Sequence, residues 1–465
     1  MKADLTEILY EKSRPIINSK ELEVLDESTI PDQYEWDVIG IYPEFEYQSF
    51  EGFGTALTDS ACWLLTQMPG EEKQKAIKAW FGKGGVNAVF IRASIDSCDY
   101  SLEEYQAVSD PVADPGLDTF SIEHDKKYMI PIIKEAIALS DRDIRVMMSP
   151  WSPPYQWKTA PMKPGTRGVT DETAVDIPSR NYGGSLKPEY YGAWAKYIVK
   201  YILAYINEGV PVDMLTLQNE SYAITEWDSC FWTADAQKVF LRDHLYPGMK
   251  EAGLAGKVRI FAWDHNKERI LENLGALIDD DTAGMIDGVA YHWYSGDHFD
   301  VLRMVGEKYP KLPMIHSESC ALHIPDGKSD FTDGIKYARD MIGDLNNGMH
   351  GFIDWNLTVD RKGGPRHVPD GFSAPIVTED DGKVTFTLSY EYIKLFSRTV
   401  PPGSIRIGSS TCDRDLETAA VRRPDGGIGI IIYSLSDKEE KIHIRCSGKA
   451  VNMTVKPGSF NSIIL

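Results

Sequence analysis

Two short, mostly apolar runs each end in a glutamate. Residues 212–220 (VDMLTLQNE) end at Glu220, and residues 313–318 (PMIHSE) end at Glu318. Such runs are typical of parallel strands that are buried on both faces, because polar residues do not alternate with apolar ones. In barrel enzymes the chemistry lies at the C-terminal ends of such strands. We therefore expect Glu220 and Glu318 to face each other across one pocket.

A pair of carboxyl groups can hydrolyse a glycosidic bond. One group protonates the leaving oxygen, and the other attacks the sugar or activates water. A separation of about 5–5.5 Å gives retention and about 6.5–9.5 Å gives inversion, a distance that sequence spacing does not supply. Further polar and aromatic residues lie at the ends of predicted strands: Arg92, Asp99, Trp151, Asn219, Asp264, His292, Tyr294 and Trp355. Aromatic rings stack on sugars and carboxylates bind their hydroxyls, so this set favours a carbohydrate ligand.

Strand and helix patterns alternate through the middle of the chain, which predicts an α/β fold. Helix-like stretches such as 126–139, 190–207 and 332–345 separate the apolar runs. Eight runs are predicted as strands, one near residue 52 and the others at 87–95, 144–149, 214–218, 258–262, 288–292, 314–316 and 351–355. Eight strand–helix units fit a closed (β/α)₈ barrel, which has about 250 residues and can exceed 400 with insertions.

A doubly wound open sheet is the alternative fold. It favours a glycine-rich phosphate turn after the first strand, and Gly52-Phe53-Gly54 lacks the third glycine of that motif. The pattern therefore favours the barrel.

The C-terminal part has a different pattern. After Pro401-Pro402-Gly403, short runs with alternating apolar residues predict a small β-sandwich. That segment is too short for two full sheets, so we expect strands near Val38 and Ile41 to complete it. The predicted segments are N-terminal strands of the sandwich (1–50), the catalytic barrel (51–401) and the C-terminal sandwich (402–465).

Composition and charge limit the partners. The 465 residues are 42% hydrophobic and 26% charged, with a formal net charge of -21. A surface this acidic repels phosphate backbones and anionic lipids, so we expect no nucleic acid and no membrane anchor as partners. The expected partner is a carbohydrate or glycoside substrate, and the sequence does not predict the oligomeric state.

The six cysteines show no paired spacing of the metal or redox kind, and the first residues carry charges where a signal peptide is apolar. We interpret the cysteines as reduced thiols of a cytoplasmic protein. Histidines such as His265, His292, His298 and His316 lie on different predicted strands without ligand spacing, so we expect no metal and no cofactor.

The chain resembles glycoside hydrolase family 30, the family of acid β-glucosidase (glucosylceramidase). The resemblance is collinear over nearly the whole chain. It rests on Gly52-Phe53-Gly54, Ile91-Arg92, residues 97–101 (SCDYS), residues 149–154 (SPWSPP), Gln218-Asn219-Glu220, Asp264-His265-Asn266, His292-Trp293-Tyr294, residues 317–320 (SESC), Asp354-Trp355-Asn356, Gly363-Gly364-Pro365 and Pro402-Gly403-Ser404. Together these motifs imply a retaining double displacement with catalytic acids on the fourth and seventh barrel strands.

The resemblance implies that Glu220 is the acid/base and Glu318 the nucleophile. Glu220 must then hold a proton near neutral pH, and we expect burial and a neighbouring carboxylate to raise its pKa. Donors such as Tyr294 and Arg92 could keep Glu318 ionised.

The other site residues have implied roles on the sugar. Asn219 would bind the sugar 2-hydroxyl, and Asp99 and Trp151 would hold the terminal sugar. Trp355 would form a stacking wall, and His292 would contact the sugar or support the residues that do.

Some of these residues have a plainer interpretation. Arg92 could be only a structural partner of a carboxylate, and a structural salt bridge is the alternative for Glu220 and Glu318. Residues 264–266 favour a hydrogen-bond network behind the site over direct sugar contact.

The chain departs from the family pattern where the leaving group would bind. Ser221 replaces the proline that usually follows the acid/base. Arg366 and Asp370 stand where the glucosylceramidase pattern has asparagines, and the loop 159–187 is longer and more polar. These departures leave the aglycone and the role of His367 undetermined.

The leading hypothesis is an exo-acting retaining β-glucosidase. Endo-β-1,6-glucanase, β-xylosidase, β-fucosidase and β-glucuronidase share the chemistry, and Arg366 and His367 could pair with a uronate. A non-catalytic carbohydrate-binding protein is the alternative from another class.

Overall fold

The computed structural model describes residues 2–29, 38–159, 181–322, 329–368, 371–411 and 413–465. Most of the predicted loop 159–187 and the position Asp370 lie outside this part of the chain. Within it, no helix is both long enough and apolar enough to cross a bilayer.

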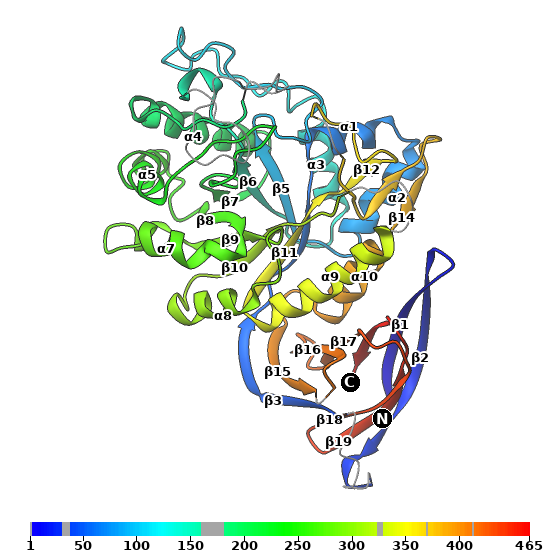
Figure 1. The fold of residues 1–465 in the computed structure, drawn as a ribbon. Helices are drawn as coiled ribbons and strands as arrows, with labels where there is room; N and C mark the ends of the chain where they lie inside the picture. Colours follow the sequence, from blue (N-terminus) through cyan, green and yellow to red (C-terminus); the bar gives the residue numbers. More distant parts are fainter. Residues whose placement is uncertain (1, 30–37, 160–180, 323–328, 369–370, 412) are drawn as a thin grey trace.

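Eight parallel strands close into a barrel in chain order, as predicted (Figure 1). The last strand pairs in parallel with the first, Gly351 lying opposite Gly52. The strands are β4 (Gly52–Ala56), β5 (Phe90–Ile95), β6 (Arg145–Pro150), β7 (Val212–Thr216), β8 (Arg259–Asn266), β9 (Gly288–His292), β10 (Met314–Glu318) and β11 (Met349–Asn356). Their residues are almost all buried, which explains the continuous apolar runs in the sequence.

Apolar side chains fill the lower barrel, and polar ones lie at its C-terminal end. One buried cluster inside the barrel consists of Val89, Phe90, Met147, Met214, Phe261, Ala290, Ile315 and Ile353. Because this layer seals the barrel, the strand ends form the floor of a site and not the mouth of a pore.

Helices form the layer around the barrel (Figure 1). They are α1 (Asp59–Gln67), α2 (Gly70–Phe81), α3 (Met129–Leu139), α4 (Tyr191–Asn207), α5 (Ala234–Phe240), α6 (Tyr246–Glu251), α7 (Ile270–Leu277), α8 (Phe299–Lys308), α9 (Ser329–Asn346) and α10 (Leu388–Thr399). Threonines begin three of them: the hydroxyls of Thr58, Thr233 and Thr387 each accept from a backbone N–H of the first turn. Such caps stabilise a helix by about 1 kcal/mol.

A small sheet packs beside α1 and α2 and comprises β12 (Thr358–Asp360), β13 (Ile376–Thr378) and β14 (Val384–Phe386).

The second domain is a closed nine-stranded sheet built from both ends of the chain. Its strands are β1 (Lys2–Glu11), β2 (Arg14–Asp26), β3 (Val38–Ser49), β15 (Ile405–Thr411), β16 (Leu416–Arg422), β17 (Ile428–Ser434), β18 (Glu440–Cys446), β19 (Lys449–Val455) and β20 (Phe460–Ile464). β1 pairs with β20, and β3 lies between β18 and β15. Strands were predicted for residues 1–50 as a whole, but the β1–β2 hairpin was not predicted individually, because β2 is largely exposed and lacks a regular apolar alternation.

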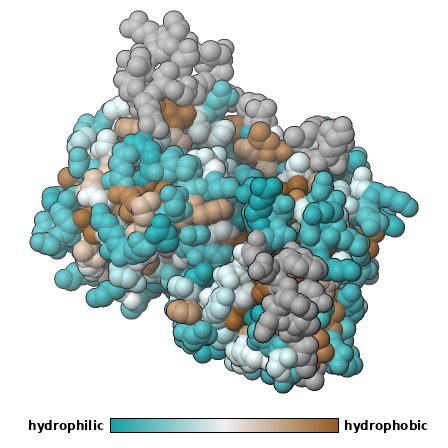
Figure 2. Space-filling model, turned by 60° about the horizontal axis from the view of Figure 1, so that its bottom comes forward, coloured by the Kyte–Doolittle hydropathy of each residue, from teal (hydrophilic) through white to brown (hydrophobic). Residues whose placement is uncertain are grey.

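Helix α10 joins the two domains. It packs against β1, β17 and β20, and the ring of Tyr392 lies 4.6 Å from that of Phe460. Figure 1 places the smaller domain on the side of the barrel covered by α9 and α10. On the face seen in Figure 2, hydrophilic side chains dominate, in keeping with the strongly acidic composition.

Candidate active site

A pocket of about 550 Å³ opens at the C-terminal ends of the barrel strands. Seven of the nine predicted site residues line it: Asp99, Trp151, Asn219, Glu220, Tyr294, Glu318 and Trp355. The other two, Arg92 and His292, are fully buried directly beneath them. Folding therefore brings together residues that are up to 263 positions apart in the sequence, from Arg92 to Trp355.

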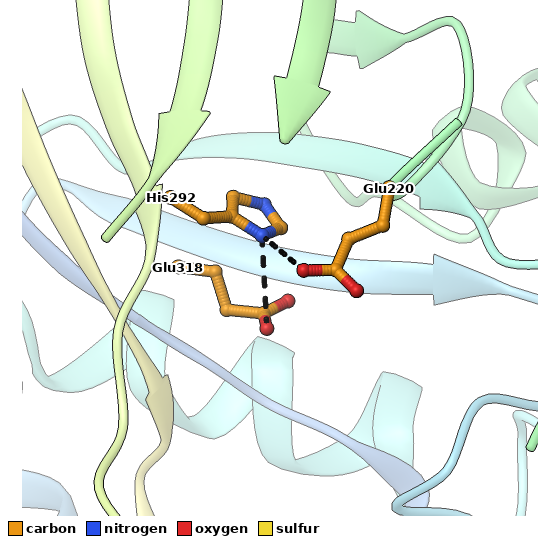
Figure 3. Close-up of side chains that lie close together, drawn as sticks. All are labelled: Glu220, His292 and Glu318. Atoms are coloured by element: carbon orange, nitrogen blue, oxygen red, sulfur yellow. Dashed lines mark hydrogen bonds and ion pairs between the residues drawn. The ribbon is translucent and has the colours of Figure 1, made fainter. Parts of the chain in front are cut away.

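Glu220 and Glu318 face each other in this pocket. Glu220 follows β7, the fourth barrel strand, and Glu318 ends β10, the seventh. One carboxylate oxygen of each, together with a ring nitrogen of His292, lies within 4.8 Å of the others (Figure 3). An approach this close fits the retaining arrangement, in which the carboxyl groups lie about 5–5.5 Å apart, better than the separation of about 6.5–9.5 Å in an inverting enzyme.

The backbone that presents Glu220 is strained. Its φ of 49° is left-handed, a conformation that costs a non-glycine residue of the order of 1–3 kcal/mol. The backbone N–H of Glu220 donates to the Asp264 carbonyl oxygen at 2.8 Å, and Asp264 and Trp263 also have positive φ. The two strained segments hold each other, and the turn aims the Glu220 carboxylate across the pocket.

Glu318 is held by two donors. The Tyr294 hydroxyl donates to Oε1 at 2.9 Å, and the Arg92 guanidinium donates to Oε2. These contacts stabilise a negative charge and leave its oxygens at the pocket wall, where the side chain is 9% exposed.

Arg92 is the centre of the charged network. Besides Glu318, its Nη2 donates to Asn219 and Asp264, each at 2.9 Å, and its Nε donates to Ser149 at 3.1 Å. It therefore fixes the nucleophile candidate, the neighbouring amide and a buried carboxylate at once. Arg92 is therefore a structural partner of a carboxylate and does not line the pocket as a sugar contact, and that carboxylate is a candidate catalytic group.

His292 links both sides of the site. Its Nδ1 lies 3.1 Å from Glu220 and 3.9 Å from Glu318, and its Nε2 lies 3.1 Å from Asp264. Asp264 also accepts from Thr216 and Ser317, so it belongs to a network behind the pocket, as predicted, whereas its neighbours His265 and Asn266 line the pocket itself. His292 supports the carboxylates from below and does not line the cavity.

The expected rise in the pKa of Glu220 is wrong for this structure. Burial opposes its ionisation, but hydrogen bonds and positive charge from His265 and His292 outweigh burial and lower the pKa of Glu220. Burial opposes the charge of His292 as well, yet the charge of Glu318 and the hydrogen bonds of Asp264 and Glu220 raise the pKa of His292 to about 9. Below that pH the Glu220–His292 pair therefore holds one proton, on the ring. The sequence could not show this because it does not place the imidazoles beside Glu220.

Aromatic residues and Asp99 form the closed end of the pocket. The rings of Trp151 and Trp355 stack at 5.2 Å with an interplanar angle of 27°. Burial raises the pKa of Asp99 to about 7, partly opposed by the charge of Arg366. This end offers ring surface and an acidic oxygen, the two features that bind a sugar ring and its hydroxyls.

Arg366 and His367 lie behind this wall. Arg366 has a guanidinium nitrogen 3.9 Å from an Asp99 oxygen, and its guanidinium lies 5.2 Å from the Tyr100 ring and 5.0 Å from the Phe372 ring. His367 lies 3.0 Å from an oxygen of Asp228. Neither residue lines the pocket.

Several pocket residues were not predicted. Trp227, Leu322, Lys336 and Phe372 also line the pocket, and Trp227 and Phe372 pack against the cluster that contains Trp151 and Trp355. The sequence pattern predicts that Lys336 faces solvent on a helix, and the other three residues lie in loops. No apolar periodicity therefore indicated that these residues line the pocket. The aromatic and apolar content of the loops was the one available signal.

The pocket has the donor atoms of a metal site, but they are engaged. Glu220, His292 and Glu318 contact one another, and Arg92 and Tyr294 donate to Glu318. The absence of a metal or cofactor from the chemistry stays a prediction.

A (β/α)₈ barrel with two facing carboxylates on its fourth and seventh strands, at the end of a pocket walled by tryptophans, defines an O-glycoside hydrolase. Residues 50–392 match the glycosyl hydrolase family 30 TIM-barrel domain, and residues 403–463 match the family 30 beta sandwich domain. The chain belongs to glycosyl hydrolase family 30.

Relatives and solved structures agree with this membership. Lysosomal acid glucosylceramidase of Mus musculus is 28% identical over 90% of this chain and 82% of its own length. The crystal structure of SrfJ from Salmonella typhimurium has a TM-score of 0.90 and 29% identity, covering 100% of this chain and 99% of that one. The endo-β-1,6-glucanase BT3312 has a TM-score of 0.80 and 26% identity, covering 99% of both chains.

Proposed function

We propose that this glycoside hydrolase is a retaining, exo-acting β-glucosidase with Glu318 as nucleophile and Glu220 as acid/base. The observation that carries the proposal is the pair of facing carboxylates, whose oxygens lie within 4.8 Å of each other.

The first step transfers the sugar to Glu318. Its carboxylate oxygen forms a bond to the anomeric carbon while the bond from that carbon to the leaving oxygen breaks. The leaving oxygen takes a proton through the carboxyl group of Glu220. Arg92 and Tyr294 keep the attacking oxygens in place. In the second step Glu220 takes a proton from water, whose oxygen attacks the anomeric carbon and releases Glu318.

The Glu220–His292 pair supplies the proton of the first step. Its one proton lies on His292 in the free enzyme and reaches the leaving oxygen through Glu220, which His292 contacts at 3.1 Å. A leaving oxygen that gains negative charge beside Glu220 draws the proton toward itself.

A neutral sugar fits the closed end better than a uronate. Asp99 and Glu318 line that end, whereas the cation Arg366 lies behind Asp99 and outside the pocket. A uronate carboxylate would meet like charge there, which argues against β-glucuronidase. Glucose is supported by the names of two relatives, a glucosylceramidase and an endo-β-1,6-glucanase.

Endo-β-1,6-glucanase is the second candidate, favoured by the similarity to BT3312 over 99% of both chains. The stacked Trp151 and Trp355 beside Asp99 support exo-action instead, because they cap the sugar at one end. β-Xylosidase and β-fucosidase activity stay within the same chemistry.

A panel of nitrophenyl β-glycosides and a β-1,6-glucan tests the proposal. We expect the β-glucoside to be cleaved fastest, with β-glucose as the first product by NMR. If the glucan is cleaved and none of the nitrophenyl monosaccharides is, exo-action is overturned. An α-configured first product would overturn retention.

Glu318→Gln tests whether the chain is a catalyst or a binding protein. We expect turnover to fall by several orders of magnitude while glucose binding, followed by calorimetry, persists. Unchanged turnover would exclude Glu318 as nucleophile.

We also propose a cytoplasmic location. Five cysteines in the described part of the chain are free and buried, which supports a reducing compartment. Fractionation of the source cells tests it.

A further inference from the structure

His316 lies two residues before Glu318 on β10, but on the other side of the strand. Ile315 packs inside the barrel, and the Ser317 hydroxyl donates to Asp264. Between His316 and Glu318 the pairing with β9 shifts by one residue, which is a β-bulge. The bulge breaks the alternation of the strand, so Glu318 enters the pocket while His316 faces α9.

The His316 ring is fully buried, makes two hydrogen bonds and has its Nδ1 3.8 Å from an oxygen of Asp340. Its Nδ1 lies 2.8 Å from an oxygen of Asp344 on α9, and its Nε2 lies 3.0 Å from the backbone carbonyl oxygen of Glu318. The ring therefore spans from the helix layer to the backbone of the residue that carries the proposed nucleophile.

A buried charge cluster orients this ring. Lys267 Nζ lies 2.7 Å from oxygens of both Asp340 and Asp344, and the Tyr291 hydroxyl donates to Asp344 at 3.1 Å. Burial raises the pKa of Asp340 to about 7 and also raises that of Asp344, so both carboxyl groups hold a proton more readily than exposed ones do. The Lys267 ammonium between them offsets the cost of burying their negative charge.

The contact with Glu318 requires a donor on the ring. A backbone carbonyl only accepts, so Nε2 must carry hydrogen. Burial lowers the pKa of His316, which favours the neutral ring, and burial raises the pKa of Asp344, which favours a proton on the carboxyl oxygen that faces Nδ1. One tautomer satisfies both contacts, and the cluster selects it.

We propose that His316 is a positioning residue for the nucleophile: its Nε2–H holds the Glu318 carbonyl, fixes the bulge and so sets where the Glu318 carboxylate lies. This inference rests on the proposed role of Glu318. The side chain of His316 touches neither substrate nor the reacting oxygens. It acts through the backbone, as Arg92 and Tyr294 act through the carboxylate.

Two substitutions separate the contacts of His316. In His316→Gln the amide nitrogen reaches the position of Nε2, so the donor to Glu318 is kept. In His316→Asn the amide nitrogen corresponds to Nδ1, so the contact with Asp344 is kept and the donor to Glu318 is lost. Tyr291→Phe is the control, because it removes a hydrogen bond of the cluster and leaves His316 and Glu318 in contact.

We expect His316→Asn to lower kcat about 100-fold with KM within about twofold, since a misplaced reacting group has a cost of this order. His316→Gln should retain kcat within about threefold, and Tyr291→Phe should lower Tm without changing kcat. The rate at which a 2-fluoro-glucoside labels Glu318, followed by mass spectrometry of the folded fraction, should fall in step with kcat in His316→Asn.

Equal losses in His316→Asn and His316→Gln would overturn the proposal in favour of a role in stability. Wild-type kcat in His316→Asn would overturn it outright. If His316→Asn does not fold, loss of activity in a stable His316→Gln variant overturns it and retention supports it. Failure of the proposed function is distinguishable, because the wild-type protein would then cleave no glycoside and Glu318 would not be labelled.

Discussion

Two buried charge networks lie on opposite sides of the strand β10. On the pocket side, Arg92 meets Glu318 and Asp264, and His292 joins Glu220 to the same group. On the helix side, Lys267 meets Asp340 and Asp344. Both place a fully buried cation between two carboxylates, but only the first has oxygens at a cavity wall.

The difference lies in how each network is closed. The helix-side network is fully buried, and burial raises the pKa of both of its carboxyl groups, which lowers its negative charge. The pocket-side network contains three carboxylates, Glu220, Asp264 and Glu318, against one arginine and two imidazoles that are charged only while protonated. A network with excess negative charge at a cavity is suited to stabilise the positive charge of an oxocarbenium-like transition state.

The largest expected effect comes from removing Glu220. Glu220→Ala should lower the turnover of an alkyl glucoside by several orders of magnitude. The turnover of a dinitrophenyl glucoside should fall much less, because its leaving group needs no proton. Added azide should restore turnover and give a β-glucosyl azide, identified by NMR. Equal losses for both substrates would remove Glu220 from the acid role.

The two buried cations give a matched comparison. Arg92→Met and Lys267→Met should each lower the free energy of unfolding by about 3–5 kcal/mol, because each leaves buried carboxylates unpaired. Only Arg92→Met should also abolish turnover, since only Arg92 contacts Glu318. Urea denaturation and kcat, measured at one pH, check both.

The loss in Lys267→Met should depend on pH. Asp340 has a pKa of about 7, so its carboxyl group can take up a proton when the ammonium is absent. We therefore expect a smaller destabilisation at pH 5.5 than at pH 8. A pH-independent loss would contradict proton uptake by Asp340.

Alkaline pH should stop the pocket-side network from supplying its proton. The pKa of His292 is about 9, so kcat/KM should fall by about tenfold per pH unit above pH 9. The same proton should affect stability: folded His292 keeps it up to about pH 9, whereas the unfolded chain releases it near 6.5. This contribution is fully present below about pH 6.5 and is lost as the pH rises through 9. The free energies of unfolding of the wild type and of His292→Asn, measured at pH 6 and 9.5, isolate the contribution of this proton.

Asp99 gives the smallest expected effect. Its pKa is about 7, so it is mostly protonated at pH 6 and ionised at pH 8. A carboxylate accepts from sugar hydroxyls more strongly than the neutral acid, so KM should fall severalfold as the pH rises from 6 to 8. Asp99→Asn should raise KM and remove this dependence. A pH dependence that survives the substitution must come from another group.

Strand-end residues were predictable because barrel geometry is simple. Once eight parallel strands are recognised, their C-terminal ends must meet at one face, which places Glu220, Glu318 and Trp355 in one pocket. The family motifs added Arg92, His292 and Asp99. No such rule predicts which residues reach the pocket from loops and helices, as Trp227 and Lys336 do.

Charges were less predictable than positions. The direction of the pKa shift of Glu220 depends on two imidazoles within 4 Å, one from β8 and one from β9. An electrostatic interaction falls off over a few ångströms, so strand assignment is too coarse to determine its sign. The same holds for Arg366, which was a candidate sugar contact and lies behind Asp99.

The sequence by itself determined the barrel, the composite second domain, the family and the two facing glutamates, because apolar periodicity and strand-end motifs are local properties of the chain. Only the tertiary structure decided the proton arrangement of Glu220 and His292, the position of Arg366 and the link from His316 to Glu318. These depend on contacts between residues distant in sequence, at a bulge and in strained turns that no local pattern marks.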